Sequence, residues 1–203
     1  MTHDRDAEEQ LAGFIAKFTP AIGALAVAIR AEMRQRYPMA NELVYDNYNA
    51  LAIGFAPGEK TSEAIFSIAL YPQWVSLFFL QARGLPDPHR LLKGSGNVAK
   101  HVVLPSPGAL DQPEIKALMR EAVTRARVPF DAQNAHRLII KSISSRQRPR
   151  RPATENVPRI SAGTRPSARS GVRARSARVS GIRMSPQEDS NSAKSVCPGL
   201  QVS

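Results

Sequence analysis

The sequence predicts an α+β fold, in which helices pack on an antiparallel sheet of about five to six strands, followed by a disordered basic tail. Three observations predict this. Residues 42–80 hold eight of the twelve aromatic side chains and read as short strands between turns. Helical periodicity is confined to the segments before and after that stretch. Patterned hydrophobicity ends near Ser145, and no aromatic residue follows Phe130.

Two helices are predicted before the strands. Residues 6–18 carry one apolar stripe with the i, i+3, i+4, i+7 spacing of a helix, formed by Leu11, Phe14, Ile15 and Phe18. Thr19 and Pro20 are typical of an N-cap and a first helical residue, which starts a second helix running to about Arg36. Tyr37 stands before a proline and therefore ends that helix.

A third helix is predicted near residue 111. Asp111 is a good N-cap, and Glu114 three residues later completes a capping-box pattern. The helix that follows has a single apolar stripe, formed by Ile115, Leu118, Met119, Ala122 and Val123.

Six strands are predicted, at residues 42–48, 50–55, 63–71, 74–80, 98–104 and 138–143. Short turns between the first four favour an antiparallel meander. Residues 74–80 are apolar on both faces, so this strand is expected inside the sheet, covered by helices or by a partner chain as in a homodimer. The last strand is expected at an edge.

Charge divides the chain near Ser145. Residues 1–145 carry 16 Lys and Arg against 14 Asp and Glu, whereas residues 146–203 carry 12 against 3. The second segment has too little apolar surface to offset the entropy of ordering it. The sequence therefore predicts a domain at residues 6–145 and a disordered tail at 146–203. Such a tail favours non-specific nucleic-acid association through phosphates, and a non-functional extension is the alternative.

Several function classes are excluded or disfavoured. Cys197 is the only cysteine, so neither a disulfide framework nor a cysteine metal site forms within one chain. The N-terminus is acidic, unlike a secretory signal, and no apolar stretch approaches the length of a membrane span, which predicts a cytoplasmic protein. No nucleophile–base pair and no metal-ligand spacing is found, so we expect no enzyme and no cofactor.

One ligand-binding site is nevertheless suggested, for a small anionic ligand or a protein partner. A glycine-rich loop followed by cations can expose backbone N–H groups to an anion, and tyrosine and asparagine on the first strand can line a small site. The candidate residues are Tyr45, Asn47, Lys93, Gly94, Ser95, Gly96, Lys100 and His101. The alternatives are a plain turn, ordinary sheet packing and a structural histidine.

Four blocks resemble a known family: LVYDNYNALAIGF, SIALYPQWVSLFF, RLLKGSGNVAKHVVL and RLIIKSISSRQRPRRP. Together they are similar to the bacterial YdhG-like domains of unknown function over roughly residues 9–151. The resemblance implies a compact, frataxin-like α+β fold. For some members it also implies an intracellular iron chaperone that binds iron through surface carboxylates. In this chain the acidic residues that cluster in this way are Asp4, Asp6, Glu8 and Glu9, for which helix capping is the alternative role.

Overall fold

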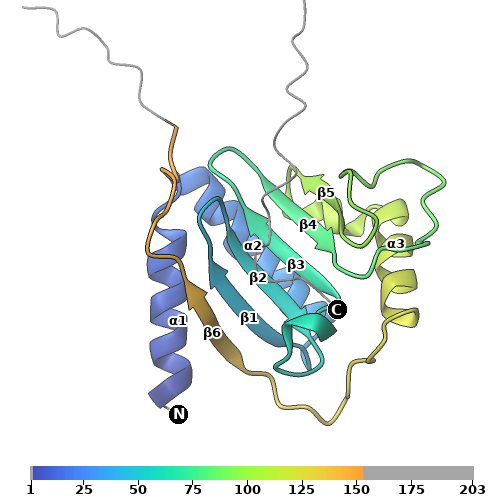
Figure 1. Cartoon of the computed structure of the whole chain (residues 1–203), viewed down its shortest axis with the longest axis horizontal. Coiled ribbons are helices and arrows are strands. Elements are labelled where there is room, and N and C mark those ends of the chain that lie inside the picture. The colour runs from blue at the N-terminus through green and yellow to red at the C-terminus, as the bar shows by residue number, and fades with distance from the viewer. Residues whose placement is uncertain (1, 153–203) are drawn as a thin grey trace, which may run out of the picture.

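The structure, a computed structural model, describes residues 2–152 (Figure 1). Within that range the helices are α1 (Thr2–Ile15), α2 (Pro20–Arg36) and α3 (Pro113–Thr124), with short 3₁₀ turns η1 (Thr61–Glu63) and η2 (Pro107–Asp111). The strands are β1 (Asn41–Asp46), β2 (Leu51–Ala56), β3 (Phe66–Leu70), β4 (Val75–Phe79), β5 (Lys100–Leu104) and β6 (Leu138–Ile143). The predicted α+β class is confirmed. Most of the predicted tail, residues 153–203, lies outside the described residues.

One six-stranded sheet organises the domain, in the order β5-β4-β3-β2-β1-β6. Strands β1 to β5 pair antiparallel with their neighbours, as the short turns predict. The sheet is mixed, however, because β6 pairs parallel with β1. The chain leaves α3, crosses one end of the sheet and enters β6 beside the start of β1, which fixes that direction (Figure 1). The expected edge position of the last strand is confirmed.

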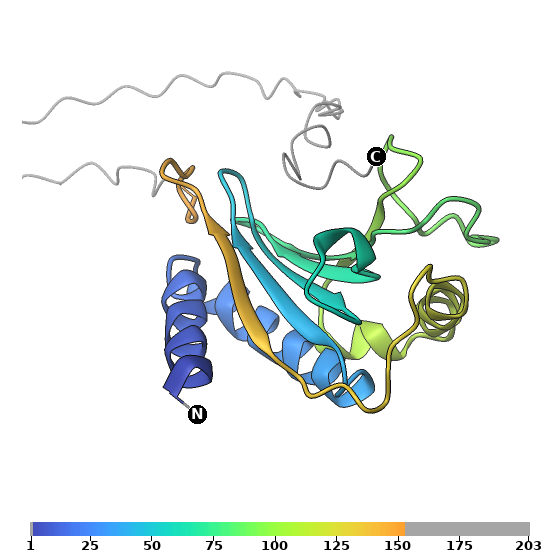
Figure 2. The same cartoon turned by 60° about the horizontal axis from the view of Figure 1, so that its bottom comes forward.

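Helices α1 and α2 lie on one face of the sheet (Figure 2). Their apolar stripes meet inward-facing residues of every strand and the buried face of α3 to form the main core. The largest fully buried side chains include Phe55, Phe66 and Phe79 from the sheet. β4 is buried along its whole length and has a strand on either side, which confirms its predicted interior position.

The other sheet face carries two smaller apolar clusters that contain no helical residue. One gathers Tyr71, Trp74 and Phe78 around the β3–β4 turn. Tyr71 and Trp74 stack with ring centroids 5.1 Å apart, which joins the two ends of that turn. We call this side of the sheet the second face.

Of the two helix N-caps predicted from the sequence, one is confirmed and the other is wrong. Thr19 caps α2 as expected, since its hydroxyl accepts the Ile22 N–H at 3.4 Å. The predicted capping box of α3 is wrong. α3 begins at Pro113 with Gln112 as its N-cap, and Asp111 belongs to η2, where it pairs with Lys116 at 2.9 Å. Proline at the first helical position moves the cap one residue along from Asp111.

The ordered chain continues past the predicted boundary at residue 145. The Arg148 N–H donates to the Tyr48 carbonyl at 2.9 Å, and Arg151 donates to the carbonyls of Ala16 and Phe18 beyond the end of α1. The Arg150 side chain is buried. Residues 146–152 therefore pack on the domain. Within the described residues, no helix has both the length and the apolar content to cross a membrane.

Candidate functional site

The eight predicted site residues do not come together in one place. Tyr45 lies on β1 and His101 on β5, with three strands between them. Four strand spacings of about 4.8 Å separate them by roughly 19 Å. Both side chains point to the second face, because the strand registers connect each to residues of that face. They share a face without lining a common small cavity.

Asn47 is not a strand residue, since β1 ends at Asp46. Its N–H donates to the Ala50 carbonyl at 3.0 Å, and its own carbonyl accepts a bond from Arg150. Asn47 thus forms the β1–β2 turn and anchors the C-terminal segment.

The glycine-rich loop at residues 93–97, called the glycine loop below, is a turn that packs against β5. Lys93 and His101 exchange two backbone hydrogen bonds, of 2.7 and 2.9 Å, and the Lys100 ammonium donates to the Gly94 carbonyl. Gly94 has a φ of 115°, a conformation that favours glycine. Ser95 and Gly96 are exposed at the tip. With Lys100 directed at a carbonyl of its own loop, these contacts match the plain-turn alternative better than an anion cradle.

His101 stacks on Phe78 with ring centroids 4.8 Å apart. Burial, assisted by the nearby Lys93 charge, lowers the pKa of His101. The ring is therefore neutral at pH 7 and packs as an aromatic group, whereas an imidazolium that attracts anions would need a raised pKa.

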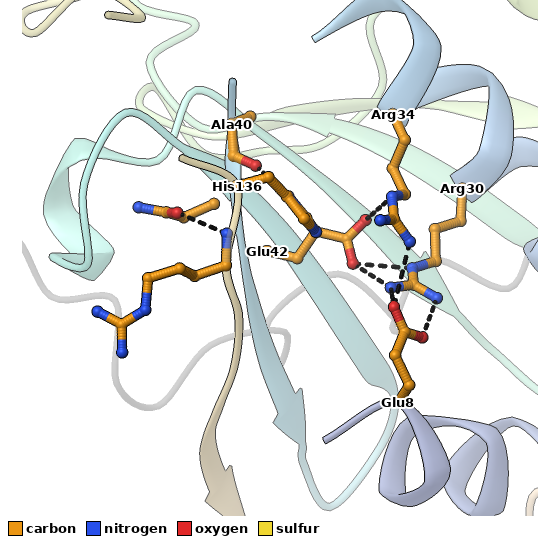
Figure 3. Close-up of polar contacts among 8 residues, drawn as sticks. Glu8, Arg30, Arg34, Ala40, Glu42 and His136 are labelled. Carbon is orange, nitrogen blue, oxygen red and sulfur yellow. Dashed lines mark hydrogen bonds and ion pairs between the residues drawn. The ribbon is translucent and has the colours of Figure 1, made fainter. Parts of the chain in front are cut away.

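A buried charge network lies between α1, α2 and the start of β1 (Figure 3). The Glu42 side chain is fully buried and accepts hydrogen bonds from the Arg30 guanidinium, one of them 2.8 Å from Nε. The other side of that guanidinium makes two 2.8 Å bonds to Glu8. Arg34 completes the network, 3.1 Å from a Glu8 oxygen and 3.9 Å from Glu42 Oε1.

The protonation of this network follows from its geometry. Burial lowers the pKa of Arg30, but the hydrogen bonds and charges of Glu8 and Glu42 outweigh burial, so the pKa lies above its ordinary value. The hydrogen bond from Arg30 holds the pKa of Glu8 below its ordinary value, against the effect of partial burial. Arg30 is thus held as a cation and Glu8 as an anion, and the network fastens both helices to the sheet.

This network also bears on the iron alternative. Glu8, one of the four clustered carboxylates, is engaged by Arg30 and Arg34. Among the residues whose side chains the structure describes, no group of three or more His, Cys, Asp or Glu is placed to hold a metal ion.

A pocket of about 380 Å³ lies between the 81–97 connection and α3. The connection contributes Pro86, Asp87, Pro88, His89 and Leu91, and the helix contributes Pro113, Glu114, Ala117, Leu118, Arg120 and Glu121. The Asp87 carboxylate shapes the wall from the connection, because it accepts the N–H groups of Leu91 and Leu92 at 2.9 and 2.8 Å.

The pocket wall combines apolar side chains with a surplus of acidic residues. The lining contains three acidic residues, Asp87, Glu114 and Glu121, and one arginine, Arg120. Glu121 lies 3.6 Å from Arg125, outside the pocket lining, whereas Glu114 forms no ion pair among the described residues. None of the residues that line this pocket is among the eight site residues predicted from the sequence. A pocket between a loop and a helix leaves no periodic signal.

Comparison of the chain with family models, with curated proteins and with solved structures gave no match. The fold and the geometry above are therefore the basis for the functional argument, and the resemblance to YdhG-like domains stays a prediction.

Proposed function

We propose that this protein is a non-catalytic cytoplasmic binding domain, whose ligand is a small organic cation held in the pocket between the 81–97 connection and α3. The observation that carries the proposal is the composition of that pocket. Its volume, about 380 Å³, falls within the range of roughly 300–1,000 Å³ that is common for small-molecule sites.

The charges of the lining support a cation. Glu114 stands in the first turn of α3 without an ionic partner among the described residues, and Glu121 follows two turns later on the same side. An ammonium or guanidinium group between them would meet two carboxylates, with Arg120 of the lining and Arg125, the partner of Glu121, as the competing cations. The proposed ligand therefore has the opposite charge to the one predicted from the sequence, where the glycine loop favoured an anion at Lys93, Lys100 and His101.

The apolar part of the lining supports an organic body on that cation. Leu91, Ala117 and Leu118 offer carbon surface, and burying such surface yields about 25 cal/mol per Å². Each partly exposed charge pair adds only about 0–1 kcal/mol, so most of the affinity comes from the apolar contact. A bare metal ion or a hydrophilic polyamine would gain less.

A matched pair of probes tests the proposal with the full-length protein. 3-Phenylpropylamine and 3-phenylpropionate share a carbon skeleton and differ in charge, and thermal shift and calorimetry measure their binding. We expect the amine to bind more tightly than the carboxylate, because the shared skeleton gives both the same apolar contact and only the amine is attracted by the carboxylates of the lining. Glu114→Gln should weaken amine binding about threefold, since it removes one exposed charge pair.

Ala117→Trp provides the steric arm of the test, because Ala117 lines the pocket from an exposed position on α3. The indole should fill the pocket and abolish amine binding without unfolding the domain. Thr124→Trp, at the end of the same helix and outside the lining, is the matched control. Equal binding of both probes, or amine binding that survives Ala117→Trp, would refute the proposal.

A further inference from the structure

A second surface lies at the other end of the domain, where the β1–β2 turn, the end of α1 and the segment after β6 meet (Figure 1). It holds five cations and one carboxylate. The cations are Lys17, Arg146, Arg148, Arg150 and Arg151, and the carboxylate is Asp46. We call this group the basic end.

The carboxylate of the basic end is already neutralised. Asp46 is fully buried and pairs with Arg150 at 2.9 Å and with Lys17 at 2.6 Å. Arg150 is itself buried and lies over the Phe18 ring, 5.4 Å from its centroid. This buried pair fixes the path of residues 146–152, and it leaves Arg146, Arg148 and Arg151 exposed.

An exposed aromatic ring stands among these cations. Tyr48, in the β1–β2 turn, is 45% exposed, and the Arg148 guanidinium lies over its ring, 5.4 Å from the centroid. Arg148 is held there by its backbone bond to the Tyr48 carbonyl. A tyrosine stacked with an arginine offers a nucleobase both a π surface and a cationic plane.

The chain that continues from the basic end has the same sign of charge. Residues 153–203 carry eight Lys and Arg against three Asp and Glu, and no aromatic residue. Their composition supplies phosphate contacts without base stacking. Tyr48 supplies, on the folded domain, the ring that the following segment lacks.

From this arrangement we infer that the basic end binds single-stranded nucleic acid, with Tyr48 and Arg148 stacking on a base and the exposed Arg146 and Arg151 contacting phosphates. The inference is independent of the pocket on α3. A single strand is favoured over a duplex because its bases are free to stack on an exposed ring. An anionic membrane surface would also attract the cations, but it offers no nucleobase that could stack on Tyr48.

Fluorescence anisotropy of the full-length protein with a labelled 20-nucleotide single strand, measured over a range of salt concentrations, tests the inference. The triple variant Arg146→Gln/Arg148→Gln/Arg151→Gln should weaken binding about tenfold or more near 0.1 M salt. It should also reduce the slope of log K against log salt by about 1.4, because two phosphate contacts are lost at about 0.7 each. Tyr48→Ala should weaken binding about tenfold with the slope unchanged.

The control removes three exposed cations elsewhere, as Arg5→Gln/Arg83→Gln/Arg127→Gln, with the same change in net charge. It should alter the slope by less than half as much as the triple variant. Equal effects of the two triple variants would mean that net charge alone decides, and would overturn the inference. So would a Tyr48→Ala protein that binds like the wild type, or a duplex bound as tightly as the single strand.

Binding to vesicles of phosphatidylcholine, with and without phosphatidylserine, tests whether the basic end binds membranes instead. We expect the basic-end variants to change oligonucleotide binding and to leave vesicle binding at the level of the control variant. The opposite pattern would assign the surface to membranes and refute the inference. Circular dichroism of each variant confirms that the fold is retained.

Discussion

Removing Arg30 should destabilise the domain far more than removing its neighbour Arg34. Arg30 alone contacts both carboxylates closely, and without it the fully buried Glu42 keeps only the Arg34 Nε at 3.9 Å. Removing one partner of a buried ion pair typically costs about 3–5 kcal/mol, because the remaining charge is left without compensation. Since small domains are stable by only about 5–15 kcal/mol, Arg30→Met should remove a large share of that stability.

Two further variants separate this effect from simple charge loss. The Arg34 side chain is 42% exposed and its partner Glu8 is 40% exposed, so Arg34→Met should cost no more than about 1 kcal/mol. In Arg30→Met/Glu42→Leu no buried charge is left unpaired, so the double variant should recover most of the loss.

Urea denaturation measures these changes through the fluorescence of Trp74, the single tryptophan, with circular dichroism as a second probe. The expected result is a lower midpoint for Arg30→Met with an unchanged dependence of the unfolding free energy on urea concentration. If Arg30→Met and Arg34→Met cost the same, or if the double variant is less stable than Arg30→Met, the assigned role of the network is wrong.

Three other predictions use the same assay. Arg150→Met leaves the buried Asp46 with Lys17 alone, so it should cost about 3 kcal/mol, and a loss below about 1 kcal/mol would contradict the anchoring of the C-terminal segment. The lowered pKa of His101 means that the unfolded chain takes up a proton first as pH falls below about 6.5, so stability should fall from pH 7 toward pH 5. His101→Phe should flatten that dependence, and an unchanged profile would contradict it. The lowered pKa of Glu8 stabilises the fold above about pH 4.3, and this contribution is lost as pH falls further, so Glu8→Gln should lose less stability than the wild type between pH 5 and pH 3. Equal losses would count against the Arg30 contact.

Local patterns in the sequence predict most of the secondary structure. The apolar stripes of the helices and the period of two in the strands depend on neighbouring residues, and each is found close to its predicted position. The pairing of β6 with β1 joins residues about a hundred positions apart, and no short-range signal gives its parallel direction.

The buried carboxylates illustrate what local patterns miss. Glu42 and Asp46 look like ordinary polar residues of a half-exposed strand, yet both are buried, because cations from distant segments neutralise them. The same pairing explains the domain boundary. Residues 146–152 have no apolar pattern, and they are held to the domain by the pairing of Arg150 with the buried Asp46 and by hydrogen bonds of Arg148 and Arg151.

The candidate site was predictable only in part. The sequence predicted a site in the 81–97 connection, which contains the glycine loop, and other residues of this connection line the pocket. The loop itself, however, is closed by Lys100, and three strands lie between Tyr45 and His101. Which side chains of the connection face α3 depends on how the two segments pack, and neither segment encodes that alone.

The most direct test of the proposed function is a nuclear magnetic resonance titration of the ¹⁵N-labelled full-length protein with 3-phenylpropylamine and, separately, with 3-phenylpropionate. We expect saturable shifts with the amine at Leu91, Glu114, Ala117 and Glu121, and none of comparable size with the carboxylate. Saturable shifts at Lys93, Gly94 and His101 with the carboxylate, and none around α3 with the amine, would contradict it and restore the anionic site that the sequence suggested.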